Sequence, residues 1–137
     1  MSEARRFIEA LEADVAAGRR CYWAITHPDD GRVVGTLGFN FLFPPEQKMA
    51  DFGYGLSPEC WGTGMFGAAA RLVLGFGFDQ LDLDRVQVMT PAENVASVKA
   101  VERLGFRREG TLREFYPRTA GIRRDCAVLG LLRRDWK

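Results

Sequence analysis

The stretch that most constrains this chain runs from Phe52 to Ala70 and reads FGYGLSPECWGTGMFGAAA. A strand-like segment leads through a Ser-Pro turn into closely spaced glycines, and a helix follows them. A helix start offers unpaired backbone N–H groups and the positive end of the helix dipole, and residues without side chains let an anion come close. The sequence therefore predicts a phosphate-binding turn at Gly62, Gly64 and Gly67.

The glycine spacing by itself is a weak signal. It matches the dinucleotide-binding fingerprint, but that motif lies in the first strand–helix turn and needs an acidic residue at the end of the next strand. Here about 60 residues precede the glycines, and the next expected strand, Arg85–Met89, ends in Thr-Pro. These departures argue against a dinucleotide-binding oxidoreductase domain, and the lack of Gly-Lys-Ser/Thr excludes a P-loop. A turn that only packs a helix tightly on a sheet stays an alternative.

Composition narrows the class of protein. The 137 residues are 47% hydrophobic and 27% charged with a formal net charge of +1, which is typical of one globular domain over residues 1–137. This charge predicts no broad attraction to nucleic acid or to a membrane. Cys21, Cys60 and Cys126 lack metal-ligand spacing, and no signal peptide or membrane-spanning run is present. We therefore expect a soluble, cytoplasmic protein without a metal.

Hydrophobic periodicity predicts three helices and six strands. The expected elements are a helix over Ser2–Ala17, strands over Cys21–Thr26, Arg32–Phe43 and Met49–Leu56, a helix apolar nearly all round over Trp61–Leu81, a strand over Arg85–Met89, a helix over Asn94–Leu104, and paired strands over Phe106–Phe115 and Arg124–Leu132. The strand–helix–strand unit around Trp61–Leu81 predicts two parallel strands. A mixed sheet with helices on both faces is the expected architecture.

With these elements placed, the chain resembles the GNAT superfamily of acetyltransferases, and within it the RimJ/RimL-like branch, whose founding members acetylate the N-terminal amine of ribosomal proteins. Three stretches carry the resemblance: GYGLSPECWGTGMFGAAARLVLGFGF, ENVASVKAVERLGFRREGTLRE and GIRRDCAVLGLLRRDW. The resemblance implies an α/β (α+β) fold of GNAT type with a mostly antiparallel sheet. It also implies acetyl-CoA as donor and an amine as acceptor: a protein N-terminus, an aminoglycoside, a polyamine or an amino acid.

Two features depart from the branch. Its members usually open with a further strand and helix, and this chain begins after them. A sheet edge is then expected to be open, and because an open edge invites pairing with another chain, a homodimer through that edge is expected. The second departure is Phe66, which stands where a small residue is expected two places after Gly64 and predicts a slightly reshaped phosphate loop.

The resemblance implies where the donor binds. Its pyrophosphate is expected on the turn that contains Trp61, Gly62, Thr63, Gly64, Met65, Phe66 and Gly67. The pantetheine arm is expected in a gap where strand Gly53–Leu56 splays from Arg85–Met89, bound there like an added strand. A backbone N–H near Leu56 is expected to stabilise the oxyanion of the tetrahedral intermediate.

Asn94 and Ser97 form a second group of candidates. Asn is a good helix N-cap and Ser is ordinary in a first turn, so a purely structural role stays open for both. The resemblance implies that Asn94 binds pantetheine and that the Ser97 hydroxyl faces the sulfur and protonates or hydrogen-bonds the departing thiolate. Many GNAT enzymes use a tyrosine for this step, but the helix contains none. Lys99 and Arg103 are either contacts to the CoA phosphates or solvated helix charges.

A general base must remove a proton from the attacking ammonium group. The candidates are Asp51, Glu114 and Tyr116, and a raised pKa would suit a carboxylate in this role. Tyr54 is expected in the core or the cleft wall. The rival function from another class is a non-catalytic acyl-CoA-binding or assembly module, and turnover, rather than binding, distinguishes it from the enzyme.

Overall fold

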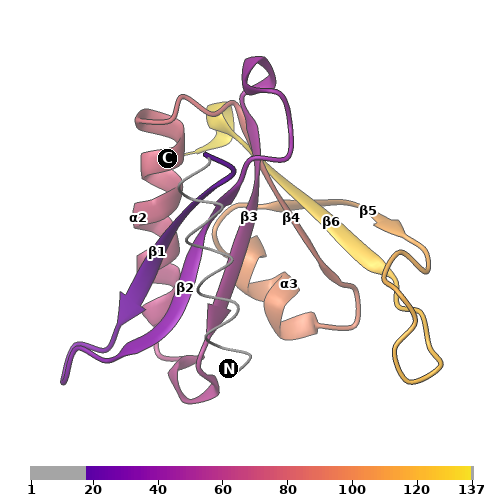
Figure 1. The fold of residues 1–137 in the computed structure, drawn as a ribbon, viewed down its shortest axis with the longest axis horizontal. Helices are drawn as coiled ribbons and strands as arrows, with labels where there is room; N and C mark the ends of the chain where they lie inside the picture. Colours follow the sequence, from indigo (N-terminus) through magenta and orange to yellow (C-terminus); the bar gives the residue numbers. More distant parts are fainter. Residues whose placement is uncertain (1–17, 137) are drawn as a thin grey trace.

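A six-stranded sheet forms the centre of the computed structural model, which describes residues 18–136. The strands are β1 (Arg20–Thr26), β2 (Val33–Asn40), β3 (Met49–Leu56), β4 (Arg85–Pro91), β5 (Arg107–Leu112) and β6 (Cys126–Leu132), in the order β1-β2-β3-β4-β6-β5 (Figure 1). Of the described neighbours, β3 and β4 pair in parallel and the others pair antiparallel. The mixed, mostly antiparallel sheet that the sequence predicted is confirmed.

Two described α-helices cover one face of this sheet. α2 (Met65–Asp79) connects β3 to β4, and α3 (Val95–Glu102) connects β4 to β5. Both connections step across the sheet in the same direction, so right-handed crossovers place both helices on the same side, behind the sheet in Figure 1. The helix expected over Ser2–Ala17 lies outside the described residues.

The hydrophobic core lies between the sheet and these helices. Side chains alternate along a strand, and the residues that face α2 and α3 are buried. They include Leu37, Phe39, Ala50, Phe52, Val86, Val88, Leu129 and Leu131. The Phe39 ring contacts α2 at Gly77, where an added Cβ would lie 2.5 Å from the ring. This glycine therefore sets how closely α2 approaches β2.

The structure corrects the expected bounds of α2. The helix begins at Met65 rather than Trp61 because Gly62 and Gly64 have φ angles of +78° and +88°, which a right-handed helix cannot contain. Residues Pro58–Cys60 form a short 3-10 turn instead. The helix is also not buried all round, since Leu72 is 78% exposed on its outer side. An apolar sequence pattern alone does not show which apolar side chains find a partner.

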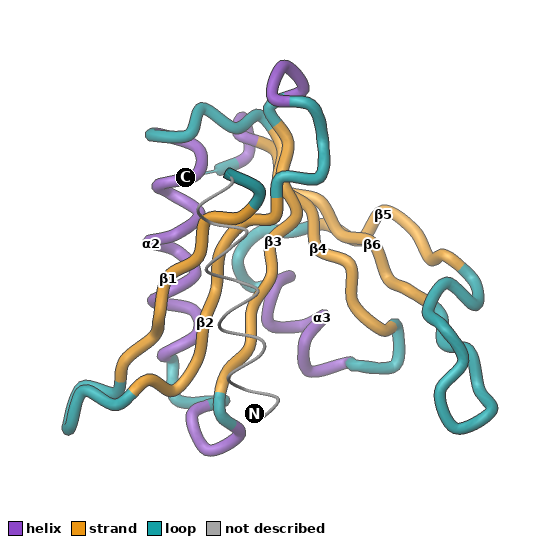
Figure 2. Tube along the Cα trace, viewed as in Figure 1, coloured by secondary structure: helices purple, strands orange, loops and turns teal. Residues whose placement is uncertain are grey.

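The last two strands are shorter than expected. β5 ends at Leu112 rather than Phe115 and β6 starts at Cys126 rather than Arg124, and the chain between them is loop (Figure 2). Glu114 has a φ of +50°, a left-handed conformation that ends the extended strand. Within residues 18–136, every helix is too short or too polar to cross a bilayer.

We expect Gly77→Ala to destabilise the protein by about 1–3 kcal/mol, because the Phe39 ring that the new methyl group meets is itself fully buried. Gly75→Ala is the matched control on the same helix. An added Cβ at Gly75 meets nothing within 4 Å, so the gain in helix propensity, up to about 1 kcal/mol, should make this variant equal to or more stable than the wild type. Urea denaturation measures both, and equal stability of the two variants would contradict the close-packing role of Gly77.

Candidate active site

β3 and β4 part after three paired residues. Met49–Asp51 pairs with Arg85–Gln87, and the rest of β3 diverges from β4 (Figure 1). Successive N–H groups of a strand point to opposite edges, and Ser57 donates its N–H to the carbonyl oxygen of Val34 on β2 at 2.7 Å. The N–H groups of Leu56 and Tyr54 consequently face the gap. The divergence expected between these strands is present, and within residues 18–136 the backbone groups on this side of β3 have no strand partner after Asp51.

A cavity of about 310 Å³ opens where the end of β3 faces α3. The residues that line it come from β3, the turn after it and the first turn of α3: Tyr54, Gly55, Leu56, Trp61, Asn94, Ala96 and Ser97. The indole N–H of Trp61 donates to the Leu56 carbonyl oxygen at 3.1 Å, which fixes the end of β3 against the turn. The structure therefore brings Leu56, Trp61, Asn94 and Ser97 together in one cavity.

A neighbouring cavity of about 260 Å³ lies at the start of α2 and shares Trp61 with the first. Its lining combines the glycine turn with two guanidinium groups: Trp61, Gly62, Gly64, Phe66, Gly67, Arg71, Ala100, Arg103 and Leu104. The Arg71 guanidinium donates to the backbone oxygen of Arg103 at 3.3 Å, so it is held beside the end of α3, and both arginines line the cavity. Helix N–H groups, a positive dipole end and two cations favour an anionic ligand.

The turn itself is built to leave space above its backbone. Gly64 is the N-cap of α2, and an added Cβ at Gly62, Gly64 or Gly67 meets nothing within 4 Å. Ala68 makes the first helical hydrogen bond, to Gly64 at 3.1 Å, so the N–H groups of the residues before it precede the helical ladder. One of them, the Met65 N–H, donates to the Thr63 hydroxyl oxygen at 3.4 Å. That the N–H groups of this turn bind an anion stays a prediction.

Other candidates from this turn have different surroundings. The Thr63 hydroxyl donates to the Cys60 carbonyl oxygen at 2.5 Å and lies inside the turn. Phe66 is buried, and its ring centroid lies 4.9 Å from that of Tyr54 and 5.0 Å from that of Trp61. Thr63 and Met65 line neither cavity. The larger residue at position 66 thus forms part of the cleft wall.

α3 positions the second group of candidates. The Asn94 side chain caps the helix by accepting the Ser97 N–H at 3.2 Å, so the structural role considered for Asn94 is real. Ser97 is buried, with its Oγ 2.5 Å from the Tyr54 hydroxyl and 3.3 Å from that of Thr90, which donates to it. Burial raises the pKa of Tyr54, and the Ser97 hydrogen bond offsets part of the rise. Lys99 is exposed and lines neither cavity.

The three candidate bases lie in different places. Asp51 is the last β3 residue paired with β4, and it alternates with the buried Ala50 and Phe52, so its side chain lies on the face of the sheet away from α2 and α3. Like the other two candidates, it lines neither cavity around Trp61. Burial raises its pKa, with smaller lowering effects of Gln87 and Arg85. Its Oδ1 atom is buried and has no hydrogen-bond partner within the described part of the chain. Asp51 therefore has the raised pKa that suits a carboxylate base.

Glu114 and Tyr116 lie in the loop between β5 and β6. The Glu114 side chain is exposed, while its backbone N–H donates to Asp125 at 2.8 Å and its carbonyl accepts from Arg123 at 2.9 Å. The Tyr116 hydroxyl donates to the Cys126 sulfur at 3.5 Å, and burial raises the pKa of this tyrosine above its ordinary value. Neither residue lines the two cavities around Trp61.

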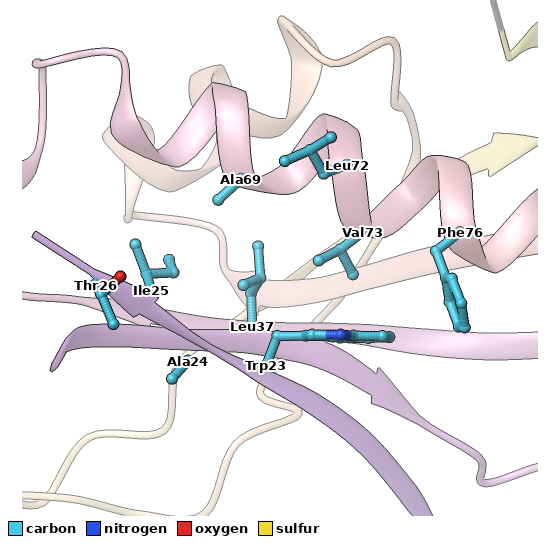
Figure 3. Close-up of a pocket in the computed structure, with 9 residues that line it drawn as sticks. All are labelled: Trp23, Ala24, Ile25, Thr26, Leu37, Ala69, Leu72, Val73 and Phe76. Atoms are coloured by element: carbon cyan, nitrogen blue, oxygen red, sulfur yellow. The ribbon is translucent and has the colours of Figure 1, made fainter. Parts of the chain in front are cut away.

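A third hollow, of about 390 Å³, lies between the edge strand β1 and α2 (Figure 3). Figure 3 shows Trp23 flat along its floor, with Leu72 and Phe76 projecting from the helix. Its described lining contains no ionisable side chain: Trp23, Ala24, Ile25, Thr26, Leu37, Ala69, Leu72, Val73 and Phe76. This hollow is an apolar groove and lacks the groups that acid–base chemistry needs. Across residues 18–136, no group of three or more His, Cys, Asp or Glu side chains is arranged to hold a metal ion.

Some site residues escaped the sequence analysis. No feature of the sequence placed Arg71 in a binding site, because a single arginine in an apolar helix is usually a solvent-exposed charge. Thr90 was seen only as the end of a strand, and Tyr54 only as core or cleft wall. Arg71 joins α2 to the end of α3, and the hydroxyl contacts of Tyr54 and Thr90 join β3 and β4 to α3, so no local pattern in the sequence could have revealed them.

Comparison with known proteins agrees with this geometry. The acetyltransferase (GNAT) domain family matches residues 1–107. Uncharacterized N-acetyltransferase p20 of Bacillus licheniformis is 31% identical over 136 residues, 99% of this chain and 75% of that protein. YdaF of Bacillus subtilis (strain 168), named provisionally as a ribosomal N-acetyltransferase, is 32% identical over 109 residues, 79% of this chain and 58% of that protein.

A solved structure extends the similarity to three dimensions. Mycobacterium smegmatis RimJ in complex with CoA-disulfide aligns with a TM-score of 0.81 and 26% identity, covering 93% of this chain and 60% of that one. The chain thus spans between 58% and 75% of the length of these three proteins. The resemblance to the RimJ/RimL-like branch is confirmed, and the chain belongs to the GNAT acetyltransferase family.

Proposed function

We propose that this protein is a cytoplasmic, single-domain N-acetyltransferase that moves an acetyl group from acetyl-CoA to a primary amine by direct attack in a ternary complex. The observation that carries the proposal is the gap between β3 and β4. It opens on the cavity that Ser97 lines, and that cavity adjoins the anion site at the start of α2. The solved complex of the similar RimJ protein with CoA-disulfide supports CoA as the ligand.

The donor uses the backbone for most of its contacts. Its pyrophosphate binds the turn that contains Gly62, Gly64 and Gly67, next to Arg71 and Arg103, because this is where N–H groups and positive charge coincide. The pantetheine arm lies along the open side of β3 as an added strand. Asn94, which lines the same cavity and caps α3 with its side-chain oxygen, contacts the arm.

The chemistry follows from this placement. The amine nitrogen attacks the acetyl carbon, and the N–H of Leu56, which faces the gap, stabilises the resulting oxyanion. The intermediate then collapses, the carbon–sulfur bond breaks, and the sulfur leaves with its electron pair next to Ser97. Asp51 takes the proton that the ammonium group must lose before it attacks, directly or through water. Glu114 and Tyr116 remain the alternative bases.

The test of this function is release of free thiol from acetyl-CoA, measured against N-terminal peptides, polyamines, aminoglycosides and amino acids. Release with one acceptor class establishes the enzyme and identifies that class. Tight binding of acetyl-CoA by calorimetry without thiol release would favour the non-catalytic acyl-CoA-binding module. A protein that binds no acetyl-CoA at all would refute both functions.

We also propose that the protein forms a homodimer through the outer edge of β1. Among the described strands β1 pairs only with β2, and the apolar groove of Figure 3 lies directly beside its free edge. Edge backbone groups and an adjoining apolar surface suit pairing with a second copy of the same strand.

We expect Leu72→Glu to shift this dimer to monomer in light scattering, because it places a charge on the exposed rim of the groove. We expect this substitution to lower the dimer affinity at least about tenfold, which corresponds to about 1.4 kcal/mol of binding free energy. Leu112→Glu, on the edge strand at the other end of the sheet, is the control and should leave the mass unchanged. A wild-type protein that is monomeric at all concentrations would contradict the dimer.

We expect Gly64→Asp to weaken acetyl-CoA binding about tenfold or more in calorimetry. The residue has a φ of +88°, and an added carboxylate would point into the open space above the turn, where the pyrophosphate charge belongs. Gly64→Asn is the matched neutral control, since Asn tolerates the left-handed conformation. Similar affinities of the Asp and Asn variants would rule out an anion at this turn.

We expect Asp51→Asn to lower the rate of transfer about 100-fold and to change how stability depends on pH. Since burial raises the folded-state pKa of Asp51, the native state binds its proton more tightly than the unfolded state. This contribution to stability is present at low pH and is lost as pH rises through the raised pKa. Denaturation measured between pH 4 and 8 should show that the variant loses less stability with rising pH than the wild type. Unchanged turnover in the variant would exclude Asp51 as the base.

A further inference from the structure

Three hydroxyl groups from three different elements meet beside the gap. Tyr54 projects from β3, Thr90 from β4 and Ser97 from α3. Ser97 Oγ is the common partner, 2.5 Å from the Tyr54 oxygen and 3.3 Å from the Thr90 oxygen. Thr90 and Ser97 are both less than a tenth exposed. The cluster therefore links the two strands that no longer pair with each other.

The hydrogen-bonding capacity of Ser97 limits how its hydroxyl can point. A serine oxygen has one hydrogen to donate and two lone pairs to accept with. Thr90 donates to one lone pair. If Tyr54 donates to the other, both lone pairs are taken, and the hydrogen of Ser97 must point away from these partners. The remaining direction is the cavity that Ser97 lines with Leu56 and Asn94.

Tyr54 is the better donor of the pair. A phenol is more acidic than an aliphatic hydroxyl and is therefore the stronger hydrogen-bond donor. The separation of 2.5 Å lies at the short end of the range for O–H···O bonds. Burial also raises the pKa of Tyr54, so its hydroxyl keeps its hydrogen at neutral pH. The ring is held by its neighbours, with centroids 5.6 Å from Phe52 and 4.9 Å from Phe66.

We propose that Tyr54, supported by Thr90, is a positioning residue that holds Ser97 with its hydroxyl hydrogen directed at the sulfur of the bound thioester. The inference rests on the proposed acetyl transfer and deepens it, by assigning the group that orients Ser97. As the carbon–nitrogen bond forms and the carbon–sulfur bond breaks, the electron pair moves to sulfur, and the Ser97 hydrogen bond stabilises that charge. The attacking ammonium loses two protons overall, of which the thiolate takes one and the base and solvent take the other.

The first test measures kcat and the KM for acetyl-CoA by thiol release. Ser97→Ala should lower kcat about 100-fold, and Tyr54→Phe about tenfold with KM nearly unchanged, because the ring and its packing remain. The double variant should be no slower than Ser97→Ala alone, since Tyr54 acts through Ser97. Losses that multiply in the double variant, or an unchanged kcat in Tyr54→Phe, would overturn the proposal. So would a larger loss in Tyr54→Phe than in Ser97→Ala, which would place Tyr54 itself at the sulfur.

Thr90 offers a matched pair of variants. Thr90→Val removes the second donor to Ser97 and should lower kcat several-fold. Thr111→Val makes the same change on exposed β5, where the hydroxyl accepts from Arg108 at 3.0 Å, and should leave kcat unchanged. Equal kcat values for the two variants would remove Thr90 from the arrangement.

The second test does not depend on turnover, so it separates this inference from the proposed function. A hydrogen directed at the sulfur favours the thiolate of bound CoA and lowers the pKa of that thiol. Ultraviolet absorbance of the thiolate in the complex with CoA, followed across pH, should give a lower thiol pKa in the wild type than in Tyr54→Phe or Ser97→Ala. Equal thiol pKa values in all three complexes would overturn the positioning role even if the wild type proved to be an active acetyltransferase.

Discussion

The early end of β3–β4 pairing is the constraint on which the rest of the structure depends. β3 stays bonded to β2 as far as Leu56, and β4 stays bonded to β6 as far as Pro91, so each half of the sheet keeps its own ladder. The halves are joined over only three residue pairs. The open side of β3 therefore carries backbone groups that lack a strand partner. Backbone N–H and C=O groups that are shielded from water are stable only when they are hydrogen-bonded. A ligand that lies along β3 meets this need.

The same divergence determines where charge and hydroxyl groups collect. α2 starts just after β3 ends and α3 starts just after β4 ends, so both helices begin beside the gap. The positive end of α2 then lies next to Arg71 and Arg103, while the first turn of α3 brings Ser97 to Tyr54. The glycine turn and the hydroxyl groups around Ser97 lie on one side of the sheet because the two helix starts do.

Local signals in the sequence were enough for much of the fold and part of the site. The glycine turn, the Asn94 cap and the parallel strand pair follow from spacing and chain order, and the structure contains all three. The start of α2 was misplaced because the left-handed backbone of Gly62 and Gly64 is not encoded by apolar periodicity. Contacts such as Tyr54 with Ser97 join residues 43 positions apart. They arise only when the strands and α3 have packed, so the sequence alone could not give them.

The two ends of the sheet differ in a way that limits how large an assembly can grow. β5, at the end opposite β1, is exposed along its whole length, carries Arg107, Arg108 and Glu109, and shifts register after Arg108. Charge and an irregular ladder both discourage a strand from adding there. In the proposed homodimer the two β1 edges pair with each other through a two-fold axis, and only the charged β5 edges stay at the ends of the joined sheet. In that arrangement the β5 edges do not favour the addition of further strands, so the proposed assembly would stop at two copies.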